Sequence, residues 1–84
     1  MSHDTQAGTP HGTHDKLLRM ANQIATFFSS QPEAVRAQGV AGHINRYWEP
    51  RMRRQLFEHI DAGGAGLSPL VIEAAKSIKR PEAA

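Results

Sequence analysis

The sequence has no cysteine, few aromatic residues and no long hydrophobic run. Without cysteine a disulfide framework is excluded, and a reducing, intracellular compartment is the natural expectation. No apolar run approaches the ~18 residues that a membrane span requires. The start of the chain also lacks the charged and then apolar pattern of a secretory signal. We therefore expect a cytoplasmic protein that does not bind membranes.

Neither sign of charge dominates the chain. Ten Lys and Arg residues stand against eight Asp and Glu residues, which gives a formal net charge of +2. This excess is too small to require a nucleic-acid partner. At 84 residues the chain forms one domain at most, and a helical core of roughly 60 residues without disulfides or metals is marginally stable. Both features favour a protein that completes its stability on another protein.

Both ends of the chain have little to bury. The first fourteen residues are mostly Ser, His, Asp, Thr, Gln, Gly and Pro, and the last five read Arg-Pro-Glu-Ala-Ala. We therefore predict a disordered tail over residues 1–14, a helical domain over 15–79 and a flexible C-terminus over 80–84.

Three histidines lie in the predicted tail. Pro10 and Gly12 argue against a helix there, so the three-residue spacing of His11 and His14 places no pair of ligands on one face. A metal site needs three or four fixed ligands with supporting contacts. We expect His3, His11 and His14 to be solvated, with weak adventitious binding of nickel or zinc as the alternative.

Apolar residues recur at helical spacing in four segments, and no segment alternates as a strand does. Caps, prolines and glycines between the segments predict helices over 15–29, 32–48, 50–62 and 69–78, with Asp15 capping the first. The predicted fold class is all-α, a small bundle of about four short helices.

Two pairs of neighbouring residues bear on how the first two helices pack. We expect Phe27 and Phe28 in the core, with the alternative that one of them overhangs the apolar stripe and docks elsewhere. Gly39 and Gly42 each weaken a helix by roughly 1 kcal/mol against Ala, so we expect them to allow close approach of the first helix. A break near Gly39 is the alternative. Leu67 is expected to anchor the preceding loop to the core.

No combination of residues predicts catalysis. The acids are scattered over caps and exposed faces, and none forms the sheltered pair that acid–base chemistry needs. His43 and His59 fall on polar or boundary sides of their helices. The glycine-rich segment 63–66 lacks the following Lys and the preceding strand of a phosphate loop. We predict a protein that is not an enzyme and binds no cofactor or metal of its own.

Residues 43–54 form an aromatic and arginine-rich corner around a proline. Trp, Tyr and Arg dominate the energetics of protein–protein interfaces. We therefore predict that this corner contacts a partner, with the indole of Trp48 packed inside and its edge available. The alternative is a lid on the core beside a solvated arginine face. The predicted partner-binding residues are Arg46, Tyr47, Trp48, Arg51, Arg53 and Arg54, together with the flanking amides Asn22 and Gln23.

A small basic helical nucleic-acid-binding protein is the alternative function. Arg51, Arg53 and Arg54 lie at the start of a predicted helix, as the basic residues of a recognition helix do. Against this, the preceding turn is tight and carries Glu49, and the near balance of charges leaves little attraction for phosphates.

Two stretches of the chain together resemble a known family. They are residues 18–28, Leu-Arg-Met-Ala-Asn-Gln-Ile-Ala-Thr-Phe-Phe, and residues 43–53, His-Ile-Asn-Arg-Tyr-Trp-Glu-Pro-Arg-Met-Arg, followed by Leu56 and the loop 61–67. Over residues 15–78 the chain resembles the delta subunit of the soluble, NAD-dependent, molybdenum- or tungsten-containing formate dehydrogenases of bacteria.

The resemblance implies an accessory subunit that acts in assembly, cofactor loading or stabilisation of the complex. In that family the alpha subunit carries bis-molybdopterin guanine dinucleotide and iron–sulfur clusters, and other subunits carry FMN and further clusters for the reaction with NAD. The delta chain has no cofactor of its own. We expect docking on a larger subunit, alpha in the first place, and weak self-association of the isolated chain. Tyr47 stands where relatives are expected to have Phe.

Overall fold

Four α-helices follow one another over residues 10–81 of the chain. The computed structural model describes the backbone of residues 10–81 and the side chains of residues 14–81. No strand occurs within these residues, which confirms the all-α prediction, and none of their helices is long and apolar enough to cross a membrane. The elements are α1 (Pro10–Phe28), α2 (Glu33–Tyr47), α3 (Pro50–Asp61) and α4 (Pro69–Ala74), with a 3-10 turn, η1 (Ala75–Ser77), directly after α4.

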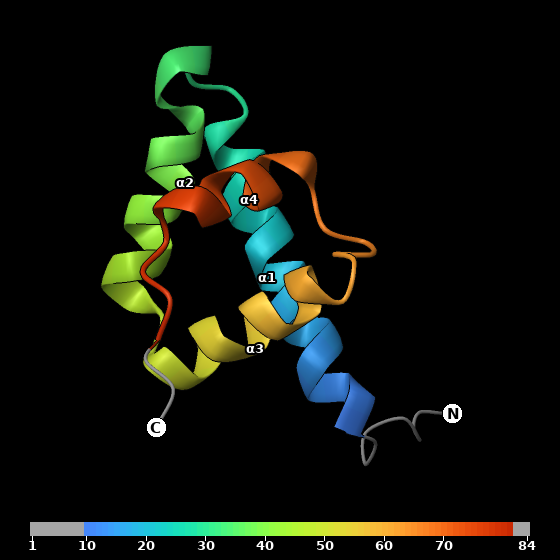
Figure 1. Cartoon of the computed structure of the whole chain (residues 1–84). Coiled ribbons are helices and arrows are strands. Elements are labelled where there is room, and N and C mark those ends of the chain that lie inside the picture. The colour runs from blue at the N-terminus through green and yellow to red at the C-terminus, as the bar shows by residue number, and fades with distance from the viewer. Residues whose placement is uncertain (1–9, 82–84) are drawn as a thin grey trace.

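The helices enclose the core from different directions (Figure 1). A short turn joins α1 to α2, which return alongside each other as antiparallel neighbours. α3 crosses from the end of α2 towards α1, and α4 lies across both α1 and α2. Each helix therefore turns an apolar side inward, as a domain with a single core requires.

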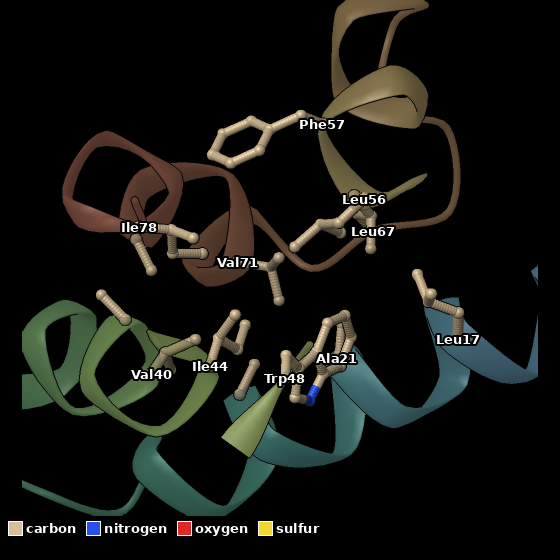
Figure 2. Close-up of a cluster of buried hydrophobic side chains, with 13 residues drawn as sticks. Leu17, Ala21, Val40, Ile44, Trp48, Leu56, Phe57, Leu67, Val71 and Ile78 are labelled. Carbon is tan, nitrogen blue, oxygen red and sulfur yellow. The ribbon is translucent and has the colours of Figure 1, made fainter. Parts of the chain in front are cut away.

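The centre of the core is formed by side chains from three helices. Ile44 of α2, Leu56 of α3 and Val71 of α4 have no exposed surface. Figure 2 shows Val71 pointing into the space bounded by Ile44, Leu56 and Trp48, with Trp48 lying beside Ala21 of α1. Burying an aliphatic side chain of this size contributes about 1.5–3 kcal/mol each, so these residues hold the four helices together.

The prediction that α1 begins at Asp15 is wrong. The helix starts at Pro10, at the first helical position, where the missing N–H of proline costs nothing. It also runs through Gly12, whose unfavourable propensity of roughly 1 kcal/mol does not stop a helix of this length. Asp15 is consequently an exposed residue inside the helix and caps nothing. Residues 1–9 of the predicted tail lie outside the described residues.

His14 is also placed differently from the prediction. It is half-buried, and its Nε2 lies 3.0 Å from Nδ1 of His59 on α3. It is therefore not a solvated tail residue. His3 and the side chain of His11 lie outside the described residues, and within the described part of the chain no three potential metal ligands come together.

The other helices begin where the sequence predicts. α2 is continuous from Glu33 through Gly39, so the alternative of a break there is wrong. α3 begins at Pro50, and the Ser68 side chain caps α4 by accepting a hydrogen bond from the Leu70 N–H at 3.2 Å. The predicted helix over 69–78, however, ends at Ala74 and tightens into η1.

Glycines have two distinct uses in this fold. Gly63, Gly64 and Gly66 have positive φ angles of 121°, 68° and 81°, which let the chain turn after α3. Gly39 instead allows close packing, because a Cβ atom at this position would overlap the ring of Phe28. Gly42 has open space around it, so the prediction of close approach is confirmed for Gly39 and wrong for Gly42.

Candidate partner-binding surface

The structure divides the predicted partner-binding residues into two groups. One group is used inside the chain, either buried in the core or bonded to the backbone of another segment: Asn22, Trp48 and Arg53. The second group is exposed to solvent: Gln23, Arg46, Tyr47, Arg51 and Arg54. The predicted corner is therefore not one continuous surface.

Asn22 ties the loop after α3 to α1. Its Nδ2 donates a hydrogen bond to the carbonyl oxygen of Gly66 at 2.9 Å, and its Oδ1 accepts one from the Ser68 N–H at 2.8 Å. Both polar atoms of the amide are thus engaged within the chain. Gln23, the neighbouring amide, is exposed on another side of α1.

Arg53 holds the segment after η1, residues 78–81, which we call the C-terminal strap. Its Nη1 donates to the carbonyl oxygen of Lys79 at 2.7 Å, and its Nε donates to that of Trp48 at 3.3 Å. Asn45 binds the same segment, since its Oδ1 accepts from the Lys79 N–H at 2.7 Å and its Nδ2 donates to the Ser77 carbonyl at 3.0 Å. These bonds redirect the chain and explain why α4 stops short of the predicted boundary.

Arg80 completes the attachment of the strap to α3. It pairs with Asp61 at 3.1 Å, and its guanidinium lies 4.1 Å from the centroid of the Phe57 ring. Both charged side chains are largely exposed, so the ion pair itself contributes little. Among the described residues no ion pair joins Arg54 to Glu58, which lies four residues later on α3.

His59 links the glycine loop to α1, because each of its ring nitrogens has one partner. The carbonyl oxygen of Ala65 lies 2.6 Å from Nε2, and a carbonyl can only accept, so Nε2 donates. In the neutral ring Nδ1 then accepts, and the Nε2–H of His14 donates to it at 3.0 Å. The two histidines therefore act in local packing between α1, α3 and the loop.

A groove of about 500 Å³ lies between α1 and α2. Phe28 forms part of its wall and rests against Gly39, while the ring of Phe27 meets that of Phe28 edge-on at 5.0 Å. Phe27 is 64% exposed. The expectation that both phenylalanines are core residues is thus wrong for Phe27, and the alternative that one overhangs is confirmed. The residues lining this α1–α2 groove are Met20, Gln23, Ile24, Phe27, Phe28, His43 and Trp48.

Tyr47 and Arg46 lie beside the α1–α2 groove on the last turn of α2. Tyr47 is 64% exposed, and its ring packs on the ring of His43, with 4.8 Å between centroids. The guanidinium of Arg46 lies 5.7 Å from the centroid of Tyr47. An aromatic residue and an arginine next to an apolar groove are the combination that protein interfaces favour.

Trp48 belongs to both the core and the α1–α2 groove. Only 5% of its surface is exposed, and one face of the indole packs beside Ala21 (Figure 2), yet the residue lines the groove. The indole nitrogen lies on the edge of the ring turned away from Leu56. Its N–H makes no hydrogen bond to the described residues, and this edge of the ring is turned away from the centre of the core.

Sequence reasoning did not find the α1–α2 groove as a site. Met20 and Ile24 follow the helical period of core residues. Periodicity alone cannot show that these two side chains line an open groove instead of the closed core. The one available signal was the pair of adjacent phenylalanines, because two neighbouring positions on a helix lie 100° apart and cannot both face the same way.

Comparison with known families identifies a match over most of the chain. A family model described as NADH-dependent formate dehydrogenase delta subunit FdsD matches residues 16–75. This span includes most of α1 and all of α2, α3 and α4. No curated protein matches the chain.

Proposed function

Since the chain belongs to the family of NADH-dependent formate dehydrogenase delta subunits, we propose that it is a non-catalytic accessory subunit. It acts by docking on a larger subunit of the complex, and so supports assembly, cofactor loading or stability of the enzyme. Alpha is the first candidate partner, on the strength of the family resemblance. The complex is cytoplasmic, and its cofactors reside in the other subunits.

The exposure of Phe27 and Tyr47 is the observation that carries the docking proposal. Each residue is 64% exposed, although the chain has few aromatic residues and a small core. Both lie at the α1–α2 groove rather than scattered over the surface. Clustered exposed apolar residues mark interaction sites, and covering them would add to the stability of a small domain.

The arginines support a protein partner better than a nucleic acid. Arg53 is bonded to the C-terminal strap, and Arg46 lies beside Tyr47 on another helix. Arg51 and Arg54 remain exposed on α3. Of the three arginines predicted for a recognition helix, Arg53 is therefore already bonded within the chain. This weakens the nucleic-acid alternative.

Co-purification tests this proposal directly. The full chain, carrying an affinity tag, is co-expressed with the other subunits of the complex and recovered under mild conditions. We expect the larger subunits to be recovered with it, together with formate-dependent reduction of NAD. Recovery of nucleic acid alone, or of the tagged chain alone, contradicts the proposal.

Omission of the chain separates its three proposed roles. The remaining subunits are expressed without it, and their assembly state, metal content and rate of thermal inactivation are measured. Defective assembly appears as free subunits, and defective loading as an assembled complex with little molybdenum or tungsten. A stabilising role appears as a loaded complex that loses activity faster. A complex that is unchanged in all three respects contradicts an accessory role.

A further inference from the structure

The α1–α2 groove offers three chemical features to a partner. Its lining is mostly apolar, it contains one buried hydrogen-bond donor, and its edge carries positive charge. Each feature restricts what can bind, and together they define the chemistry of the occupant.

The donor is the indole N–H of Trp48. The side chain is more than nine-tenths buried, and this N–H has no acceptor among the described residues. A donor in a mostly buried side chain is unfavourable when it lacks an acceptor. An occupant that places an oxygen atom at this point of the groove therefore gains stability that an entirely apolar occupant does not.

None of the residues that line the groove is acidic. Arg46 lies at the edge beside Tyr47, and the exposed Lys16 precedes Met20 by one turn on the same face of α1. Asp15 lies about 140° around the helix from Met20, because each residue advances the helix by 100°. A carboxylate on the occupant would thus meet basic residues and no opposing acid on α1.

The shape of the groove favours a helix as occupant. Its two walls are antiparallel neighbouring helices whose backbones are already hydrogen-bonded, so they cannot extend a sheet. Two such helices accept a third along the groove, with apolar side chains at positions i, i+3 and i+4 facing inward. A second copy of this chain is disfavoured, since the same basic residues would face each other across the contact.

We propose that the α1–α2 groove binds an amphipathic helix of the partner subunit that carries acidic residues beside its apolar stripe. The apolar side chains of this partner helix cover Phe27 and Met20. An oxygen of the helix accepts the hydrogen bond of the Trp48 indole N–H, and a carboxylate pairs with Arg46. The identity of the partner rests on the proposed function, whereas the chemistry of the bound segment rests on the groove.

Site-specific crosslinking identifies the bound segment. The full tagged chain is made with the photoreactive residue p-benzoylphenylalanine in place of Phe27, co-expressed with the other subunits, irradiated and analysed by mass spectrometry. The matched control places the same residue at Ile72, an exposed apolar position on α4. We expect a crosslink from position 27, and not from position 72, to a helix that bears acidic residues.

The alternative results of this experiment overturn the proposal. They are a crosslink to a second copy of this chain, a crosslink to a segment without acidic residues, equal crosslinking from both positions, or none in a complex that co-purifies.

Two substitutions test the charge and the donor. Arg46→Glu reverses the charge at the groove, and Lys76→Glu makes the same kind of charge reversal at an exposed position in η1. Trp48→Phe removes the N–H and keeps an aromatic ring. We expect Arg46→Glu and Trp48→Phe each to lower recovery of the larger subunits about tenfold, and Lys76→Glu to leave it within about twofold. Circular dichroism melting verifies that each variant folds.

The outcomes separate the two proposals. If wild type recovers the formate-oxidising complex and Arg46→Glu recovers it equally well, the groove proposal fails and the proposed function stands. If wild type recovers no such complex, the proposed function fails. If Trp48→Phe does not fold, the pair Arg46→Glu and Lys76→Glu still decides the question, because both residues are exposed.

Discussion

The two sides of α2 differ in how completely they are covered. On one side Val40 and Ile44 are buried under α4, and Asn45 binds the segment that follows it. On the other side His43 and Tyr47 border the α1–α2 groove, and Tyr47 remains largely exposed. One helix thus has a closed side that completes the fold and an open side that does not.

The difference shows where polar side chains are needed. Asn22, Asn45, Arg53 and His59 all bond to main-chain atoms of non-helical segments. Such segments cannot satisfy their own backbone groups, and side chains must do so. The walls of the groove are helices with satisfied backbones, so the side chains between them remain available for another molecule.

The largest expected difference in unfolding free energy is between an apolar residue on the closed side of α2 and an apolar residue at the groove. Ile44→Ala removes a fully buried side chain and is expected to lower the free energy of unfolding by about 2–5 kcal/mol. Phe27→Ala is expected to change it by less than about 0.5 kcal/mol, since its ring lies mostly in water. Urea unfolding followed by circular dichroism measures both. Equal losses would show that Phe27 belongs to the core and that the groove is not open.

A smaller contrast is expected between two adjacent amides. Asn22→Ala removes both bonds to the loop after α3 and is expected to lower the free energy of unfolding by about 1–3 kcal/mol. Gln23→Ala, one residue further along α1, is expected to have an effect within about 0.5 kcal/mol. The same unfolding measurement compares them, and a larger loss at Gln23 contradicts the assignment of Asn22 to the loop.

The smallest effects are expected at the two glycines of α2, and they should differ in sign. Gly42→Ala is expected to stabilise by about 0.5–1 kcal/mol, because the position is helical and open. Gly39→Ala is expected to destabilise by about 1 kcal/mol, because the new methyl group displaces the ring of Phe28. Thermal melting resolves the sign. Stabilisation by both substitutions would mean that Phe28 does not pack on Gly39.

Much of the fold follows from local sequence signals. Pro50 and Ser68 mark helix starts, and the glycines after Asp61 mark the loop, because each restricts the backbone within a few residues. The start of α1 at Pro10 was missed, since a proline is unfavourable inside a helix but acceptable at its first position. Local rules do not state which of these two positions a proline occupies.

The candidate site was harder to predict because it depends on long-range contacts. Composition alone grouped Arg53 with Arg46, but Arg53 turns to the backbone of Lys79, a partner 26 residues away. Asn22 similarly meets Gly66 across 44 residues. By contrast, the prediction that Trp48 is packed inside agrees with its burial. Residue type indicates what a side chain can do, whereas the fold decides which partner it meets.

Hydroxyl-radical footprinting of the chain, free and within the purified complex, tests the central claim most directly. Met20, Phe27 and Tyr47 at the groove are reactive reporters, and Met52 on α3 and the exposed Ile72 on α4 report on surfaces away from the groove. We predict that oxidation of Phe27 and Tyr47 falls strongly in the complex while oxidation of Met52 and Ile72 is unchanged. Protection confined to Met52 and Ile72, with Phe27 and Tyr47 still oxidised, would contradict the account and place the interface away from the groove.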